Sequence, residues 1–160
     1  MFENIENMPP QIGIIKINTD GAFHASTNTT GIGVIAHGNN CQVLGGLAQH
    51  SIQGLDALHV EFLVVLADIH LARDKGWHRV VFETDSAIVI NKFNRSRPNL
   101  SMLGPLIAHG KLLLDVFDEY RFSFYPRSNN LVAHTLASCA RNSMFTFTFE
   151  SVCPILFNQL

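Results

Sequence analysis

The sequence lacks the features that mark several specialised classes of protein. No stretch approaches the roughly 18 consecutive apolar residues of a membrane span, and residues 1–10 have neither the basic nor the apolar segment of a secretion signal. There are only three cysteines, Cys41, Cys139 and Cys153, and none has C-x-x-C spacing, which argues against a disulfide framework and a structural zinc site. We therefore expect a soluble, intracellular protein with buried free thiols that does not bind membranes. No signal distinguishes nucleus from cytoplasm.

Charge is scarce as well. Charged residues make up 15% of the chain and the formal net charge is -2, so there is no overall attraction to nucleic acid. Basic residues do gather locally, in one group comprising Arg73, Lys75, His78 and Arg79 and in another comprising Lys92, Arg95 and Arg97. Such groups permit contacts with phosphates, although a solvated face explains them more simply.

Length and composition predict one globular domain, because 160 residues that are 47% hydrophobic can bury a sizeable core. Residues 1–12 are polar and contain Pro9-Pro10, so we expect a flexible lead-in before a domain at 13–142. Residues 143–160 form an apolar tail with three alternative roles: it could add an edge strand to the sheet, cover an edge of the core or form an interface with a partner. We expect the tail to pack on its own domain and the protein to be a monomer.

Hydrophobic periodicity predicts a mixed α/β fold. We expect strands at 13–19, 31–37, 41–49, 78–84 and 120–126, and helices at 55–75, 85–93, 101–118 and 128–142. Ser128 or Asn129 is the expected cap of the last helix. Strand-helix-strand crossovers require parallel pairing, so the first, fourth and fifth strands form a parallel set with helices on both faces, and the other two strands add at one edge.

The Asp20-Gly21 pair has two interpretations. Asp-Gly between apolar residues is a strong hairpin-turn signal, but Asp20 can also be a carboxylate carried along a strand for chemistry. Glu61 in the long helix and Asp85 after the fourth strand are candidates for the same crevice. Three converging carboxylates repel one another unless a cation lies among them, and a hard divalent ion with oxygen ligands supplies that charge.

These acidic residues lie in motifs that together resemble the ribonuclease H type 1 family, and in particular its plant-type, retroelement-derived reverse transcriptase-like branch. The resemblance runs from about residue 9 to residue 142, through Lys16-x-Asn18-x-Asp20-Gly21-Ala22, Gly31-Ile32-Gly33, Glu61, Glu83-Thr84-Asp85-Ser86 and Arg127-x-x-Asn130-x-x-Ala133-His134. Each fragment is weak alone, but their order along the expected elements is informative. The resemblance implies a five-stranded sheet in the order 3-2-1-4-5, with strand 2 antiparallel.

What the resemblance implies for function is cleavage of the RNA strand in RNA·DNA hybrids by two Mg²⁺ ions, with Mn²⁺ as a substitute. Asp20, Glu61 and Asp85 then match metal ligands, and the hairpin tip moves to residues 24–30. The fourth family position, usually acidic, is His134. Imidazole is a poorer magnesium ligand than carboxylate, so His134 fits a softer ion, a proton shuttle or a cap on the pocket.

The same resemblance implies that Gly21, Arg127 and Asn130 contact nucleic acid. Several of these residues also have a purely structural explanation. Glu61 fits an exposed carboxylate near a helix start, and Asp85 and Asn130 fit helix caps. Asp68 has no matching family position, so we expect it at the surface.

Two other enzyme classes fit poorly. His59-Val60-Glu61 has the H-x-E spacing of zinc deaminases, but no P-C-x-x-C follows. A proofreading exonuclease would need a second acid where Ala22 stands. Two other functions compete with the nuclease. One is a domesticated module that binds nucleic acid and is catalytically weak or inactive because of His134. The other is a structural protein whose tail recruits a partner.

Overall fold

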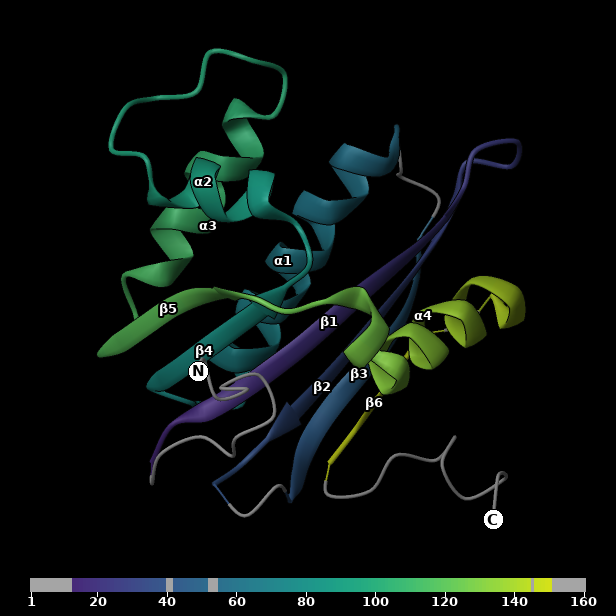
Figure 1. The fold of residues 1–160 in the computed structure, drawn as a ribbon, viewed down its shortest axis with the longest axis horizontal. Helices are drawn as coiled ribbons and strands as arrows, with labels where there is room; N and C mark the ends of the chain where they lie inside the picture. Colours follow the sequence, from purple (N-terminus) through teal and green to yellow (C-terminus); the bar gives the residue numbers. More distant parts are fainter. Residues whose placement is uncertain (1–12, 40–41, 52–54, 145, 151–160) are drawn as a thin grey trace, which may run out of the picture.

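The computed structural model describes residues 13–39, 42–51, 55–144 and 146–150. Its elements follow the predicted order, with a short strand added after the last helix (Figure 1). The strands are β1 (Ile15–His24), β2 (Thr29–His37), β3 (Val43–Ser51), β4 (Arg79–Thr84), β5 (Glu119–Phe124) and β6 (Phe147–Phe149). The helices are α1 (Ala57–Asp74), α2 (Ala87–Asn94), α3 (Gly104–Leu114) and α4 (Leu131–Ser143), with a 3-10 turn η2 (Arg127–Asn129).

The strands form one mixed sheet in the order β5-β4-β1-β2-β3-β6. β4 is parallel to both β1 and β5, whereas β2 is antiparallel to β1 and β3. The predicted order 3-2-1-4-5 is therefore confirmed, and residues 147–149 add a sixth strand antiparallel to β3. The lead-in at 1–12 and the tail at 151–160 lie outside the described residues.

The first hairpin decides between the two interpretations of Asp20. Asp20 pairs with Gly33, and Gly21 with Ile32, in the middle of the β1–β2 ladder. The chain reverses after His24, in a turn where Asn28 has a φ of 55°. The hairpin tip therefore lies within residues 24–30, and Asp20 is carried along a strand.

Helices cover the sheet on both faces (Figure 1). α1, α2 and α3 lie on one face, and α4 crosses β1, β2 and β3 on the other. The larger core is built between the sheet and α1 to α3, around Ile17, Val65, Ile69, Phe62 and Phe82. The smaller core lies under α4 and includes Ile35, Ala48, Leu136 and Ala140.

Glycine allows α4 to approach the sheet closely. A Cβ at Gly33 would overlap the backbone carbonyl of Ala133, and one at Gly31 would overlap that of Ala137. A side chain at either position would push α4 away from β2. Because α4 carries His134, this close approach also places the histidine beside β1.

Several sequence predictions need correction. The third helix begins at Gly104 rather than 101, with Pro105 in its first turn, and ends at Leu114 rather than 118. The last helix begins at Leu131 because residues 127–129 form a separate 3-10 turn, so neither Ser128 nor Asn129 is its N-cap residue.

Two remaining predictions concern thiols and membranes. Cys139 is partly rather than fully buried, while Cys41 and Cys153 lie outside the described residues. Within the described part of the chain, no helix has the length and apolar character needed to cross a bilayer.

Candidate active site

The carboxylate of Asp20 is held near the middle of the sheet by groups from three segments. Only 6% of the residue is exposed. Oδ1 accepts a hydrogen bond of 2.9 Å from the Gly21 N–H, and Oδ2 lies 2.7 Å from Nδ1 of His134 on α4. Nη2 of Arg127 lies 3.8 Å from Oδ1, at the start of the segment that leads into α4. Asp20 is thus a buried carboxylate with cationic or hydrogen-bonding partners on the α4 side.

Glu61 and Asp85 enter the same region from α1 and from the end of β4. The start of α1 is fixed by Asp56, whose side chain accepts a hydrogen bond from the His59 N–H. Oε2 of Glu61 then accepts a 2.6 Å hydrogen bond from Oγ of Ser86, which is also the N-cap of α2. Ser86 therefore links the orientation of Glu61 to the helix that begins directly after Asp85.

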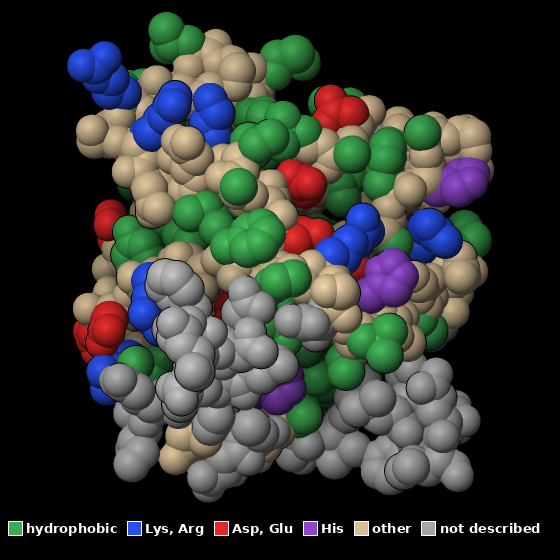
Figure 2. All heavy atoms as spheres, in the orientation of Figure 1, with side chains coloured by type: hydrophobic (Ala, Val, Ile, Leu, Met, Phe, Trp, Pro, Cys, Tyr) green, Lys and Arg blue, Asp and Glu red, His purple; other side chains and the backbone are tan. Residues whose placement is uncertain are grey.

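These side chains line one cleft of about 240 Å³. Its lining comprises Thr19, Asp20, Gly21, Phe23, Ala57, Val60, Glu61, Val64, Thr84, Asp85 and Arg127. On this face, acidic side chains are followed by basic and histidine side chains across the middle of the molecule (Figure 2). The structure brings Asp20, Glu61 and Asp85 into one cleft, although 65 positions separate the first from the last.

The environment of Asp85 shows that the carboxylates interact. Burial raises the pKa of Asp85 above its ordinary value, the negative charge of Asp20 raises it further, and Arg127 opposes the shift. A cleft in which the charge of Asp20 disfavours the ionised form of Asp85 favours a positively charged ligand.

The donor set suits a hard divalent cation, because three carboxylates line the cleft and such cations prefer oxygen ligands. In the described residues, however, no three His, Cys, Asp or Glu side chains are already arranged to hold one ion. Both oxygens of Asp20 have a hydrogen-bonding partner, His134 or Gly21, and one oxygen of Glu61 accepts from Ser86. A cation bound at these oxygens would displace those hydrogen bonds or share the oxygens with them.

The residues predicted to contact nucleic acid differ in their surroundings. The Arg127 side chain is 62% exposed at the edge of the cleft, where it is accessible to a ligand. A Cβ on Gly21 would lie 2.8 Å from Val64 and 2.9 Å from Val60, so the small size of this residue makes room for α1. Asn130 is 7% exposed, and its side-chain amide donates a 2.5 Å hydrogen bond to the backbone carbonyl of Thr19. Direct contacts of these three residues with nucleic acid remain predictions.

Sequence reasoning assigned no role to a polar network beside Asp20 on β1. Lys16 Nζ lies 2.8 Å from Glu83 Oε1, and the Asn18 amide donates to the other oxygen of Glu83. Burial raises the pKa of Glu83, while Lys16 and Asn18 oppose the shift. The i, i+2, i+4 spacing of Lys16, Asn18 and Asp20 was the available signal, since it places all three on one face of a strand.

The prediction that Asp68 lies at the surface is wrong. Asp68 is fully buried on α1, and neither carboxylate oxygen has a hydrogen-bond partner among the described residues. Burial raises the pKa of this carboxyl well above its usual range. The hydroxyl of nearby Thr19 donates instead to the carbonyl of Gly33. The apolar pattern of α1 continues on both sides of Asp68, so a core position was readable from the helical period, but the acidic residue type obscured it.

Residues 18–140 match the model of the reverse transcriptase-like family. None of the curated proteins matches the chain.

Solved structures share the fold at low sequence identity. RNase H1 of Halobacterium salinarum superposes with a TM-score of 0.69 at 18% identity, covering 81% of this chain and 98% of that one. The N-terminal RNase H domain of a Mycobacterium tuberculosis protein gives 0.69 at 20% identity, covering 81% and 94%. LC11-RNase H1, isolated from compost and crystallised with an RNA/DNA hybrid, gives 0.66 at 20% identity, covering 81% and 98%. The chain therefore has the RNase H fold and belongs to the reverse transcriptase-like family.

Proposed function

We propose that this protein is a metal-dependent endonuclease that cleaves the RNA strand of RNA·DNA hybrids. The observation that carries the proposal is the convergence of Asp20, Glu61 and Asp85, from β1, α1 and the end of β4, in one cleft beside Arg127. The structurally similar LC11 enzyme was crystallised with an RNA/DNA hybrid, which supports this class of substrate.

The three carboxylates would hold Mg²⁺ or Mn²⁺. Two such ions, when bound, supply positive charge at a scissile phosphate and help to activate water. The other roles belong to side chains of the protein. Ser86 orients Glu61, and the exposed guanidinium of Arg127 is placed to bind a phosphate oxygen at the edge of the cleft. His134 fixes the rotamer of Asp20 through the 2.7 Å contact.

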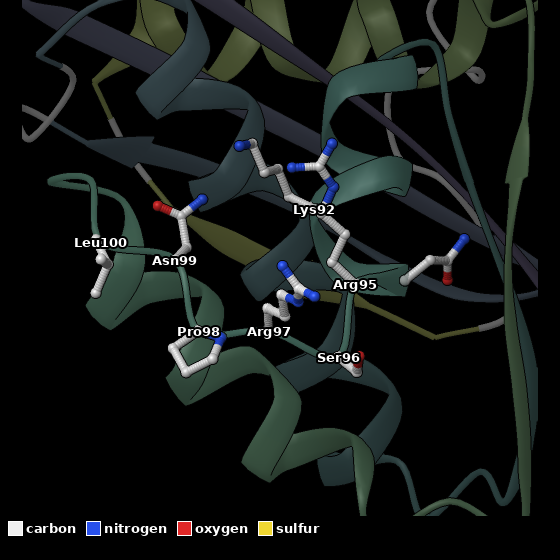
Figure 3. A pocket seen from close by; sticks show the side chains of 8 residues that line it. Lys92, Arg95, Ser96, Arg97, Pro98, Asn99 and Leu100 are labelled. Atoms are coloured by element: carbon white, nitrogen blue, oxygen red, sulfur yellow. The ribbon is translucent and has the colours of Figure 1, made fainter.

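A basic loop beyond the end of α2 supports a polyanionic substrate. Residues 95–103 connect α2 to α3, and a cavity of about 650 Å³ lies at this loop. Its lining contains three cations, Lys92, Arg95 and Arg97, with both polar and apolar neighbours and without a carboxylate. Figure 3 shows these three side chains around the cavity, and Figure 2 shows basic side chains gathered over this part of the molecule. Three cations without acidic neighbours favour phosphate groups.

A second candidate function has an observation of its own. His134 hydrogen-bonds Oδ2 of Asp20, so a cation at that oxygen must displace this contact or share the oxygen, and a histidine adds no negative charge to the cleft. This arrangement favours a module that binds nucleic acid but cleaves it slowly.

The experiment that tests the proposal offers the protein four labelled substrates: an RNA·DNA hybrid, duplex DNA, duplex RNA and single-stranded RNA. Reactions contain Mg²⁺, Mn²⁺ or a chelator. We expect cleavage of the RNA strand within the hybrid alone, and only with metal. Binding of the hybrid without cleavage under either metal would support the second candidate, whereas cleavage that persists in chelator would contradict the proposed chemistry.

A further inference from the structure

The outward face of α2 forms a second surface beside the acidic cleft. Ala87, Ile90, Asn91, Asn94 and Arg95 line a shallow cavity of about 600 Å³ together with Phe124. The first five follow the i, i+3, i+4, i+7, i+8 spacing of one helix face, which continues one residue past the end of α2. We name these six residues the α2 platform.

Phe124 supplies the aromatic group of the α2 platform. It is the last residue of β5, pairs with Thr84 next to Asp85, and is 52% exposed. In the described part of the chain β5 pairs only with β4, so Phe124 lies at a free edge of the sheet. A half-exposed phenyl ring leaves a face available to a flat ligand.

The α2 platform connects two surfaces that would both contact nucleic acid. It begins directly after Asp85 and Ser86 of the acidic cleft. At its other end, Asn94 and Arg95 also line the basic cavity of the α2–α3 loop, where Figure 3 shows Arg95 beside Lys92 and Arg97. No carboxylate lines either cavity. Apolar, amide and guanidinium groups therefore run from the cleft to the loop.

We infer that the α2 platform binds unpaired nucleotides that extend from the duplex in the cleft. An aromatic ring and aliphatic groups for base stacking, beside cations for phosphates, are the chemistry with which proteins bind single strands. Each cavity contains at least one basic side chain and no carboxylate, so its charge attracts a polyanion and repels a basic partner. The inference rests on the proposed function, because the acidic cleft supplies the duplex from which the strand extends.

The test measures binding rather than cleavage. Affinity for a blunt RNA·DNA hybrid is compared by fluorescence anisotropy, in chelator, with affinity for the same hybrid carrying six unpaired nucleotides at either end. We expect the extension to tighten binding to the wild-type chain by about tenfold, as one or two stacked bases do. An equal affinity for the two substrates would overturn the inference.

Variants at Phe124 separate stacking from general apolar contact. Phe124→Ala and Phe124→Leu should lose the gain from the extension, whereas Phe124→Trp should keep it. Tyr120→Ala is the matched control, because Tyr120 is another exposed aromatic residue on β5, four positions away, and it should keep the gain. Retention of the gain in Phe124→Leu would overturn stacking and indicate that the platform binds another kind of partner.

The contribution of Arg95 to phosphate binding is measured from the dependence of affinity on salt concentration. Arg95→Ala should reduce the slope of log affinity against log salt by about one for the extended substrate, while Arg73→Ala, at an exposed position near the end of α1, should not. If the wild type cleaves the hybrid but binds the blunt and the extended substrate with equal affinity, only the inference about the α2 platform is overturned. If the extension tightens binding but the wild type cleaves no hybrid, the inference holds and the endonuclease proposal is contradicted.

Discussion

Nδ1 of His134 lies 2.7 Å from Oδ2 of Asp20, so a histidine on α4 holds the first carboxylate of the cleft. The contact joins an exposed side chain to a buried one, with 47% of the histidine and 5% of the aspartate side chain accessible. A cation that takes Oδ2 must displace this hydrogen bond or share the oxygen with it. We therefore expect His134 to influence how readily the cleft binds metal.

Replacing His134 with a carboxylate should favour metal binding. We expect His134→Asp to raise Mg²⁺-dependent cleavage of the hybrid by about tenfold, equivalent to about 1.4 kcal/mol, because it adds a negative charge and a hard ligand. In chelator the same variant should melt at a lower temperature than the wild type, since the introduced carboxylate faces Asp20, and Mg²⁺ should reverse the loss.

His134→Asn is the control for that prediction, since it removes the imidazole without adding charge. Equal cleavage rates in the two variants would show that negative charge at this position does not limit the reaction.

Asn130 should also act by positioning the start of α4. Asn130→Ala removes the hydrogen bond to the buried carbonyl of Thr19, and an unsatisfied buried group costs about 1–3 kcal/mol of unfolding free energy. The variant should also cleave hybrid more slowly, because the start of α4 determines where Arg127 and His134 lie. Urea unfolding measures the first effect, with exposed Ser128→Ala as control. Wild-type stability in Asn130→Ala would refute this role.

Glycine at position 33 should be required for the approach of α4 to the sheet. Gly33→Ala places a Cβ against the Ala133 carbonyl, so we expect a loss of at least about 2 kcal/mol in unfolding free energy. Gly38→Ala is the matched control, because its nearest neighbours are side-chain atoms of Gln42 and Leu44 at 3.3 Å, which can move. Similar denaturation midpoints for the two variants would contradict the packing argument.

The buried carboxyl of Asp68 should make stability fall as pH rises. Its folded-state pKa is raised, so the folded protein retains a proton that the unfolded chain loses above about pH 4. Unfolding free energy is therefore lost from that pH up to the folded-state pKa, and is not regained above it. Asp68→Asn should remove this component, so its stability relative to the wild type should improve between pH 4 and pH 7.

Asp74→Asn, at the exposed end of the same helix, is the control for Asp68. Chemical denaturation at several pH values gives the comparison. A constant difference between Asp68→Asn and the wild type would show that Asp68 does not titrate differently on folding.

Much of this fold could be predicted because several local signals agree with it. The periods of the strands and of α1, the polar turn at residues 25–28 and the crossover rule together predict five strands, three of them parallel, whereas the order 3-2-1-4-5 comes from the family resemblance. Helix ends were less predictable, since η2 and the late start of α4 depend on how the segment packs against β1. Asp68 could not be placed from its residue type, because a buried, unpartnered carboxyl departs from ordinary preference.

The residues of the candidate site could be predicted from the sequence, but the hydrogen bonds between them could not. Asp20, Glu61 and Asp85 could be proposed from their motif positions, and the structure places all three in one cleft. The role of Ser86 in holding Glu61, and the use of the Asn130 amide inside the chain, depend on tertiary distances. Sequence spacing does not contain those distances.

The most direct test of the account compares hybrid cleavage by the wild type, Asp20→Asn and Asp118→Asn in Mg²⁺ and in Mn²⁺. Asp118→Asn makes the same change of charge at an exposed site outside the cleft. We predict metal-dependent cleavage by the wild type and by Asp118→Asn, and a loss of at least about 100-fold in Asp20→Asn. Equal rates in all three proteins, or no cleavage by the wild type with either metal, would contradict the claim that this cleft is a nuclease active site.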